Sequence, residues 1–185
     1  IGIHGIRPAM VQKEPEFDII WEKIKHYFED SLVIAHNAAF DISVLRSTAE
    51  LYNIKLPSFS YLCTMKLAKN FYPALENAKL NTVNDFLGFS FKHHDALYDA
   101  LACSNILLNI AEELSTNDIE ELARLTSVAV GRVTPWGYTP STSIGRPIKT
   151  TNKIYFYVEQ NREELFSTEA FRGHVVVFTG RLNTM

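Results

Sequence analysis

The sequence lacks several features that would assign it to a particular class of protein. No run of about 18 apolar residues occurs, so no membrane-spanning helix is predicted. The opening stretch, IGIHGIRPAM, has no basic region followed by an apolar region, which argues against a secretory signal. The first residue is not methionine, and we therefore expect the chain to begin inside a longer protein.

Cysteine is scarce, and acidic residues are absent from one long stretch. The two cysteines, Cys63 and Cys103, lie among apolar residues without metal-ligand spacing. They predict buried free thiols in a reducing compartment, here the cytoplasm. The net charge is −3, which by itself argues against nucleic-acid binding. However, no acidic residue occurs from Leu122 to Val158, so the acidic front half is followed by a basic segment.

What the sequence contains is an alternation of helical and strand patterns. Because 46% of the 185 residues are hydrophobic, one well-packed core is expected. Alternating helices and strands predict an α/β fold with helices packed on a sheet. The expected helices cover 16–29, 38–52, 64–72, 80–89, 95–114 and 116–125, and the expected strands cover 31–35, 58–63, 153–158 and 174–178.

The segment from 131 to 152 has a different composition, with three prolines and three glycines, and predicts a linker. Two interpretations of its basic residues remain open. In the first, the segment is a solvated tether whose basic residues face water. In the second, its basic and aromatic residues contact single-stranded nucleic acid by charge and by stacking. The residues on which the second interpretation depends are Trp136, Tyr138, Arg132, Arg146 and Lys149.

Two aspartates occupy unusual positions. Asp41 follows the 31–35 strand by one helical turn and shares a helix face with Val44 and Leu45. A capping or solvated carboxylate is one interpretation, but Asn37 is better placed as the helix N-cap. Asp99 lies on a face that is apolar except for Glu113. Because an unpaired buried carboxylate costs several kcal/mol, Asp99 needs a hydrogen-bond network, a cation or a metal, although a satisfied core aspartate is also possible.

A histidine near Asp99 adds a third chemical group. His94 precedes the 95–114 helix and lies five positions before Asp99. A histidine there is often only a loop residue. Two carboxylates that share divalent metal, with a histidine that titrates near neutrality, are nevertheless the groups needed to hydrolyse a phosphodiester.

These residues resemble the motifs of a known family. The run His36-Asn37-Ala-Ala-Phe40-Asp41 resembles the second motif of the DEDDh 3′→5′ exonucleases, and His94-x-Ala-x-x-Asp99 resembles their third. HGIRPAMV at 4–11 resembles the segment leading into the first helix of that family. The resemblance covers about residues 1–115 and is closest to epsilon-type proofreading subunits of bacterial DNA polymerase III.

The resemblance implies an RNase H-like fold and two Mg²⁺ or Mn²⁺ ions held by four acids. Asp41 and Asp99 would be metal ligands, and His94 would be the general base. His36, Asn37 and Phe40 would support the site or bind the terminal nucleotide. The implied partners are DNA 3′ ends and a DNA polymerase, with no membrane.

The first motif of that family, an Asp-x-Glu pair on the opening strand, is absent: no such pair follows an apolar strand in this sequence. We therefore expect the opening strands to be missing and this 185-residue fragment to be inactive. The alternatives are a non-catalytic module that docks on DNA ends or a polymerase, and an RNA 3′-exonuclease.

The end of the sequence has a second resemblance. FRGHVVVFTG at 171–180 resembles the first strand of a BRCT domain, in which Thr179 and Gly180 would contribute to a phosphate pocket. An ordinary apolar strand that ends in a glycine turn is the alternative. The expected domains are an exonuclease domain at 1–120, a basic linker with a short strand at 121–170, and a truncated BRCT-like start at 171–185.

Overall fold

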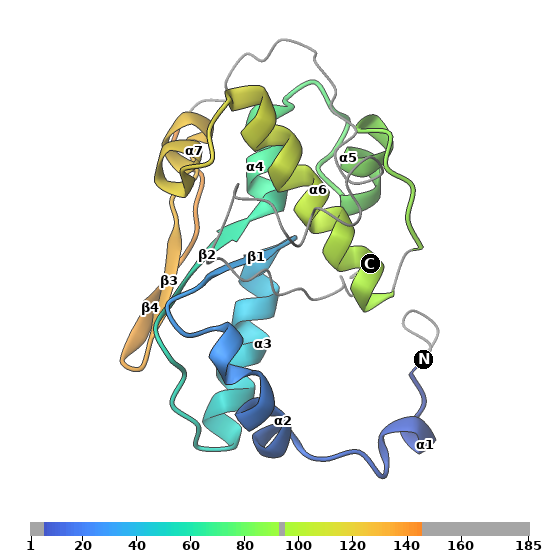
Figure 1. Cartoon of the computed structure of the whole chain (residues 1–185), viewed down its shortest axis with the longest axis vertical. Helices are drawn as coiled ribbons and strands as arrows, with labels where there is room; N and C mark the ends of the chain where they lie inside the picture. Colours follow the sequence, from blue (N-terminus) through green and yellow to red (C-terminus); the bar gives the residue numbers. More distant parts are fainter. Residues whose placement is uncertain (1–5, 93–94, 146–185) are drawn as a thin grey trace.

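A computed structural model of the chain describes residues 6–92 and 95–145 as a mixed α/β fold. Figure 1 shows the course of the chain. Four strands form one sheet in the order β1-β2-β3-β4: β1 (Leu32–Ala35), β2 (Phe59–Cys63), β3 (Gly131–Thr134) and β4 (Gly137–Thr139). The helices are α1 (Pro8–Val11), α2 (Phe17–Ile24), α3 (Ala38–Leu51), α4 (Thr64–Phe71), α5 (Leu80–Phe86), α6 (Ala96–Leu114) and α7 (Ile119–Thr126), with a 3₁₀ turn, η1 (Lys25–Tyr27).

The two parallel strands at the centre of the fold are buried on both faces. β1 pairs with β2 in parallel register, Leu32 opposite Ser60 and Ala35 opposite Cys63. Leu32 and Ile34 belong to one hydrophobic cluster, and Val33 belongs to another. Successive side chains of a strand point to opposite faces, so this division shows helices packed against both sides of the sheet.

Helices α4 to α7 contribute to the first cluster, and α2 and α3 to the second. In the second cluster, Trp21 on α2 is only 2% exposed and lies 5.1 Å from the ring of Phe28. These residues confirm the amphipathic pattern that predicted a helix in this part of the sequence, although the α-helix ends at Ile24 and continues as η1. Within the described ranges, no helix combines the length and the apolar character needed to cross a membrane.

Local sequence signals account for the ends of several helices. Asp95 caps α6, where its side chain accepts a hydrogen bond of 3.2 Å from the backbone N–H of Leu97. Asp118 caps α7 by accepting from the N–H groups of Glu120 and Glu121. Gly88 adopts a φ of 74° just after α5, which confirms that it closes this helix.

The segment from 131 to 145 differs from its predicted description as a linker. β3 pairs with β2 and β4 pairs with β3, both antiparallel, so this segment extends the sheet as a hairpin. Gly131 is buried, and a Cβ there would lie 2.4 Å from Tyr61 and 2.7 Å from the backbone nitrogen of Ser141. Glycine at this position therefore permits close packing of the hairpin rather than flexibility. This explains why the glycine and proline content wrongly predicted a linker here. The predicted strands at 153–158 and 174–178 lie outside the described residues.

Candidate active site

The candidate site forms where the two parallel strands end. β1 is followed by His36 and Asn37, and α3 begins at the next residue. β2 runs directly into α4, whose first residue is Thr64. Helix α6 packs against β1 and brings Asp99 and Cys103 toward this region. In α/β sheets, ligands bind at the carboxyl ends of parallel strands, so this location suits a site.

Asn37 makes the tight turn between β1 and α3. Its φ of 72° and ψ of 44° are left-handed, a conformation that asparagine tolerates better than most residues. It occupies the N-cap position, as the sequence predicted, but its side chain makes no capping hydrogen bond. Asparagine therefore stabilises this position by adopting the left-handed backbone conformation, not by capping the helix. The left-handed turn directs the first turn of α3 away from the strand.

Asp41 lies in the first turn of α3 and is only 9% exposed. This burial contradicts the solvated interpretation of its carboxylate. Val44, which was expected on the same face, is 48% exposed, so it does not provide the apolar cover. Burial raises the pKa of Asp41 to about 7, partly offset by a backbone hydrogen bond. Without a cation nearby, this carboxyl group is about half protonated at neutral pH.

Asp99 lies in the first turn of α6 and is 5% exposed. Its helix face carries Cys103, Ile106 and Ile110, which are all buried, as the helical spacing predicted. The expected placement of this carboxylate against an apolar face is therefore confirmed. Phe40, by contrast, is half-buried at the start of α3.

Cys103 shows that the two carboxylates lie in the same neighbourhood. Burial raises the pKa of its thiol, and a hydrogen bond with Thr64 opposes that increase. Negative charge on Asp41 or Asp99, when they are ionised, raises the pKa of Cys103 further. Both aspartates therefore lie near enough to Cys103 to influence its pKa, which puts the first turns of α3 and α6 in the same part of the fold.

A chain of hydrogen bonds connects the ends of β1 and β2 with α6 at the candidate site. His36 is 4% exposed, and its Nε2 donates to the carbonyl of Ala78 over 2.8 Å. Its Nδ1 lies 3.0 Å from Thr64 Oγ1, which in turn lies 3.1 Å from Cys103 Sγ. Since a carbonyl can only accept, a neutral imidazole accepts at Nδ1 from the threonine, and the thiol can donate to the threonine. His36 thus joins β1, α4 and the segment before α5.

Three predicted site residues lie outside the described residues. They are His94 and the two residues of the predicted phosphate pocket, Thr179 and Gly180. Within those residues, no group of three or more His, Cys, Asp or Glu side chains could hold a metal. The sequence has one Asp-x-Glu triplet, at 118–120, but it starts α7, where Asp118 is a helix cap.

The two carboxylates nevertheless fit part of a divalent metal site. Oxygen donors suit Mg²⁺ and Mn²⁺, and a bound cation would favour the ionised form of Asp41 that burial disfavours. Burial of both groups also keeps them in place before any cation binds. They account for half of the four acids that the motif resemblance implies.

Comparisons with known proteins identify the family of the chain. The model of the RNase_T family, described as exonuclease, matches residues 1–107. A DNA polymerase III of the PolC type from Caldanaerobacter subterraneus subsp. tengcongensis is 30% identical over 129 residues, which are 69% of this chain and 9% of that protein. A protein of Mycobacterium tuberculosis whose name describes a bifunctional exonuclease/endonuclease is 33% identical over 132 residues, 69% of this chain and 20% of its own length. No solved structure matches the chain.

The chain therefore spans a fifth or less of these relatives. The predicted resemblance to DNA polymerase III proteins is confirmed for a polymerase of the PolC type, whereas the resemblance to epsilon-type subunits stays a prediction. The family match ends at residue 107, before the BRCT-like stretch.

Proposed function

Because the chain belongs to the exonuclease family, we propose that it forms part of a metal-dependent 3′→5′ exonuclease that hydrolyses phosphodiester bonds at DNA 3′ ends. The observation that carries this proposal is the burial of Asp41 and Asp99 in the first turns of α3 and α6, at 9% and 5% exposure. Relatives named as DNA polymerase III favour DNA as the substrate and a polymerase as the partner, in proofreading or repair.

Each site residue has a distinct proposed role. Asp41 and Asp99 would hold the divalent ions. Mg²⁺ or Mn²⁺, when bound, supplies positive charge that offsets the charge of the carboxylates and of the phosphate. His94 would take the proton from the attacking water. His36 would keep the ends of β1 and β2 in register, since both of its ring nitrogens already bind within the protein.

The folding unit that carries this function would extend to about residue 145 rather than 120. β3 pairs with β2, and Asn70 on α4 donates to the carbonyls of Thr126 and Ser127. Removal of residues after 120 would therefore expose the side of β2 and the packing surface of α4. The BRCT-like module from 171 remains a prediction from the sequence.

The test is digestion of a fluorescent 3′-labelled strand with Mn²⁺, by the natural longer protein and its variants. We expect His94→Ala and Asp99→Asn to lower the rate by about 10²-fold or more. Asp85→Asn, which changes an exposed carboxylate on α5, is the matched control. The 185-residue chain alone should not digest the strand, because no Asp-x-Glu pair follows an apolar strand in it.

Other outcomes would change the conclusion. Cleavage of RNA without cleavage of DNA would assign the site to an RNA 3′-exonuclease. Failure of the longer protein to cleave either strand would favour a docking module that binds DNA ends or a polymerase.

A further inference from the structure

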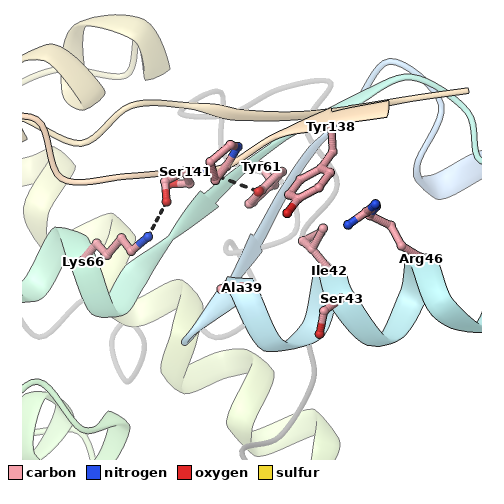
Figure 2. Close-up of a pocket in the computed structure, with 9 residues that line it drawn as sticks. Ala39, Ile42, Ser43, Arg46, Tyr61, Lys66, Tyr138 and Ser141 are labelled. Carbon is pink, nitrogen blue, oxygen red and sulfur yellow. Dashed lines mark hydrogen bonds between the residues drawn. The ribbon is translucent and has the colours of Figure 1, made fainter. Parts of the chain in front are cut away.

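A second polar site lies on the opposite flank of α3 from Asp41. Figure 2 shows a small open pocket between α3 and the β3–β4 hairpin. Arg46 lines this pocket and follows Asp41 by five residues, so the two lie roughly 140° apart around the helix. The pocket is therefore distinct from the two carboxylates. Its lining residues are Ala39, Ile42, Ser43, Arg46, Tyr61, Lys66, Tyr138, Pro140 and Ser141.

The lining carries positive charge and no carboxylate. Arg46 places its guanidinium 3.7 Å from the centre of the Tyr138 ring, and Lys66 donates to the backbone carbonyl of Ser141. Both partners are uncharged, so neither cation is neutralised by them. Hydrogen-bond donors with uncompensated positive charge favour an anion.

A buried hydroxyl in the lining has no partner. Ser141 is 3% exposed, and its Oγ makes no hydrogen bond within residues 6–92 and 95–145. Its backbone is fully used, because its N–H donates to the hydroxyl of Tyr61 and its carbonyl accepts from Lys66. A buried hydroxyl without a partner is costly. Ser141 Oγ has almost no accessible surface, so a ligand oxygen in the pocket would satisfy it once the side chain turns toward the pocket.

Aromatic side chains continue from the pocket along the hairpin. Tyr138 is 47% exposed, and Trp136, at the turn of the hairpin, is 86% exposed. Lys55 lies 5.5 Å above the Trp136 ring. An exposed aromatic beside cations is the combination with which proteins bind single strands, because every base can stack and every phosphate is negative. Arg132, by contrast, is paired with Glu120 at 3.8 Å.

From these observations we propose that the pocket binds a backbone phosphate of single-stranded nucleic acid, held by Lys66, Arg46 and Ser141, while Trp136 stacks on a neighbouring base. The identity of the polyanion rests on the proposed nuclease function. The phosphate held here is not the one that is cleaved, because neither Asp41 nor Asp99 lines the pocket. The hairpin would thus hold the strand at a second point.

Binding is measured by fluorescence anisotropy with a 5′-labelled oligothymidylate and the full 185-residue chain. EDTA is present, so cleavage does not enter the result. Ser141→Ala is the decisive variant, because its hydroxyl contributes no hydrogen bond to the fold. We expect a several-fold weaker affinity with a thermal midpoint that is equal or higher, because the substitution removes a buried hydroxyl that has no partner. Trp136→Ala should weaken binding about fivefold or more, whereas Tyr27→Ala, an exposed aromatic outside the hairpin, should not.

Charge is tested with a matched pair of lysines. Lys66→Gln should weaken binding and reduce the slope of log affinity against log salt by about 0.7, the amount expected for one phosphate contact on a single strand. Lys23→Gln removes an exposed lysine on α2 and should leave the slope unchanged. Lys66→Arg keeps the positive charge and should therefore show the same salt slope as the wild type.

Three results would overturn the proposal. They are equal affinities of Ser141→Ala and the wild type, equal salt slopes for Lys66→Gln and Lys23→Gln, or binding of inorganic phosphate alone without binding of the oligonucleotide. Failure of the proposed exonuclease function would be recognised separately, because Asp99→Asn should abolish cleavage by the longer protein while leaving binding in EDTA intact.

Discussion

His36 and Thr64 lie 28 positions apart in the sequence, yet His36 Nδ1 and Thr64 Oγ1 are 3.0 Å from each other. This hydrogen bond joins the residue after β1 to the first residue of α4, directly after β2. Because Thr64 Oγ1 also contacts Cys103 Sγ, a single hydroxyl connects two strand ends to α6. The positions of Asp41 and Asp99 depend on elements that meet at this threonine.

Replacing Thr64 with valine should therefore destabilise the fold. The substitution keeps the shape of the side chain but leaves buried polar groups of His36 and Cys103 without their partner. We expect a loss of about 1–3 kcal/mol in the free energy of unfolding, measured with urea. Thr82→Val, at a half-buried threonine on α5, is the control and should change stability by much less. Equal effects would show that the hydrogen bond contributes nothing specific.

The buried carboxyl of Asp41 predicts a dependence of stability on pH. Its pKa in the folded state, about 7, lies above the value of 3.8 for an unperturbed carboxyl. Folding thus favours the neutral form of Asp41. Its contribution to the free energy of unfolding is fully present below pH 3.8 and is lost as the pH rises through about 7. In EDTA, Asp41→Asn should stabilise the chain at pH 8 by up to ~4 kcal/mol relative to its effect at pH 4.

Urea unfolding of the wild type and of Asp41→Asn at both pH values measures this difference. Asp85→Asn is the control, because its carboxyl group is exposed. A difference between wild type and Asp41→Asn that does not change with pH would contradict the raised pKa.

Divalent metal should reverse this preference for the neutral form. If Asp41 is a ligand, binding of Mn²⁺ at pH 6 releases a proton from it, because most of the carboxyl is protonated there. The affinity for Mn²⁺ should consequently rise between pH 5 and 8. Calorimetry in two buffers with different ionisation enthalpies would detect the released proton. Asp41→Asn should abolish the release, and a wild type that binds without releasing protons would refute the assignment.

The close approach at Gly131 predicts a strong effect of one added methyl group. In Gly131→Ala, the Cβ would lie 2.4 Å from the Tyr61 ring and 2.7 Å from the nitrogen of Ser141, so the hairpin must move. We expect a destabilisation of about 1–3 kcal/mol. Gly137→Ala is a matched control in the same hairpin, since a Cβ there meets nothing within 4 Å. Similar unfolding midpoints for the two variants would disprove the close packing.

Much of this fold could be predicted from the sequence because its elements have clear patterns. The apolar strand before His36 and the apolar face around Asp99 identified β1 and α6, and the structure confirms both. The hairpin was missed because glycine and proline usually indicate a linker. Gly131 is explained by its contact with Tyr61, a residue 70 positions earlier, and such a contact leaves no local signal.

The pocket was missed for a similar reason. In the sequence, Arg46 and Lys66 are ordinary cations on two amphipathic helices, and neither belongs to a motif. Only the approach of the hairpin to α3 and α4 places them beside Ser141 and Tyr138. The aromatic residues Trp136 and Tyr138 were the signal available in the sequence, and they indicated the same class of ligand that we propose for the pocket, without its location.

The two cysteines have a practical consequence. Cys63 and Cys103 are free and buried, one at the end of β2 and the other on α6, one turn after Asp99. Alkylating reagents can reach them only when the structure around them opens, and the raised pKa of Cys103 keeps its thiol unreactive until then. The rate of thiol labelling therefore reports how often this part of the chain opens. The chain thus carries two natural probes of local unfolding at its candidate active site.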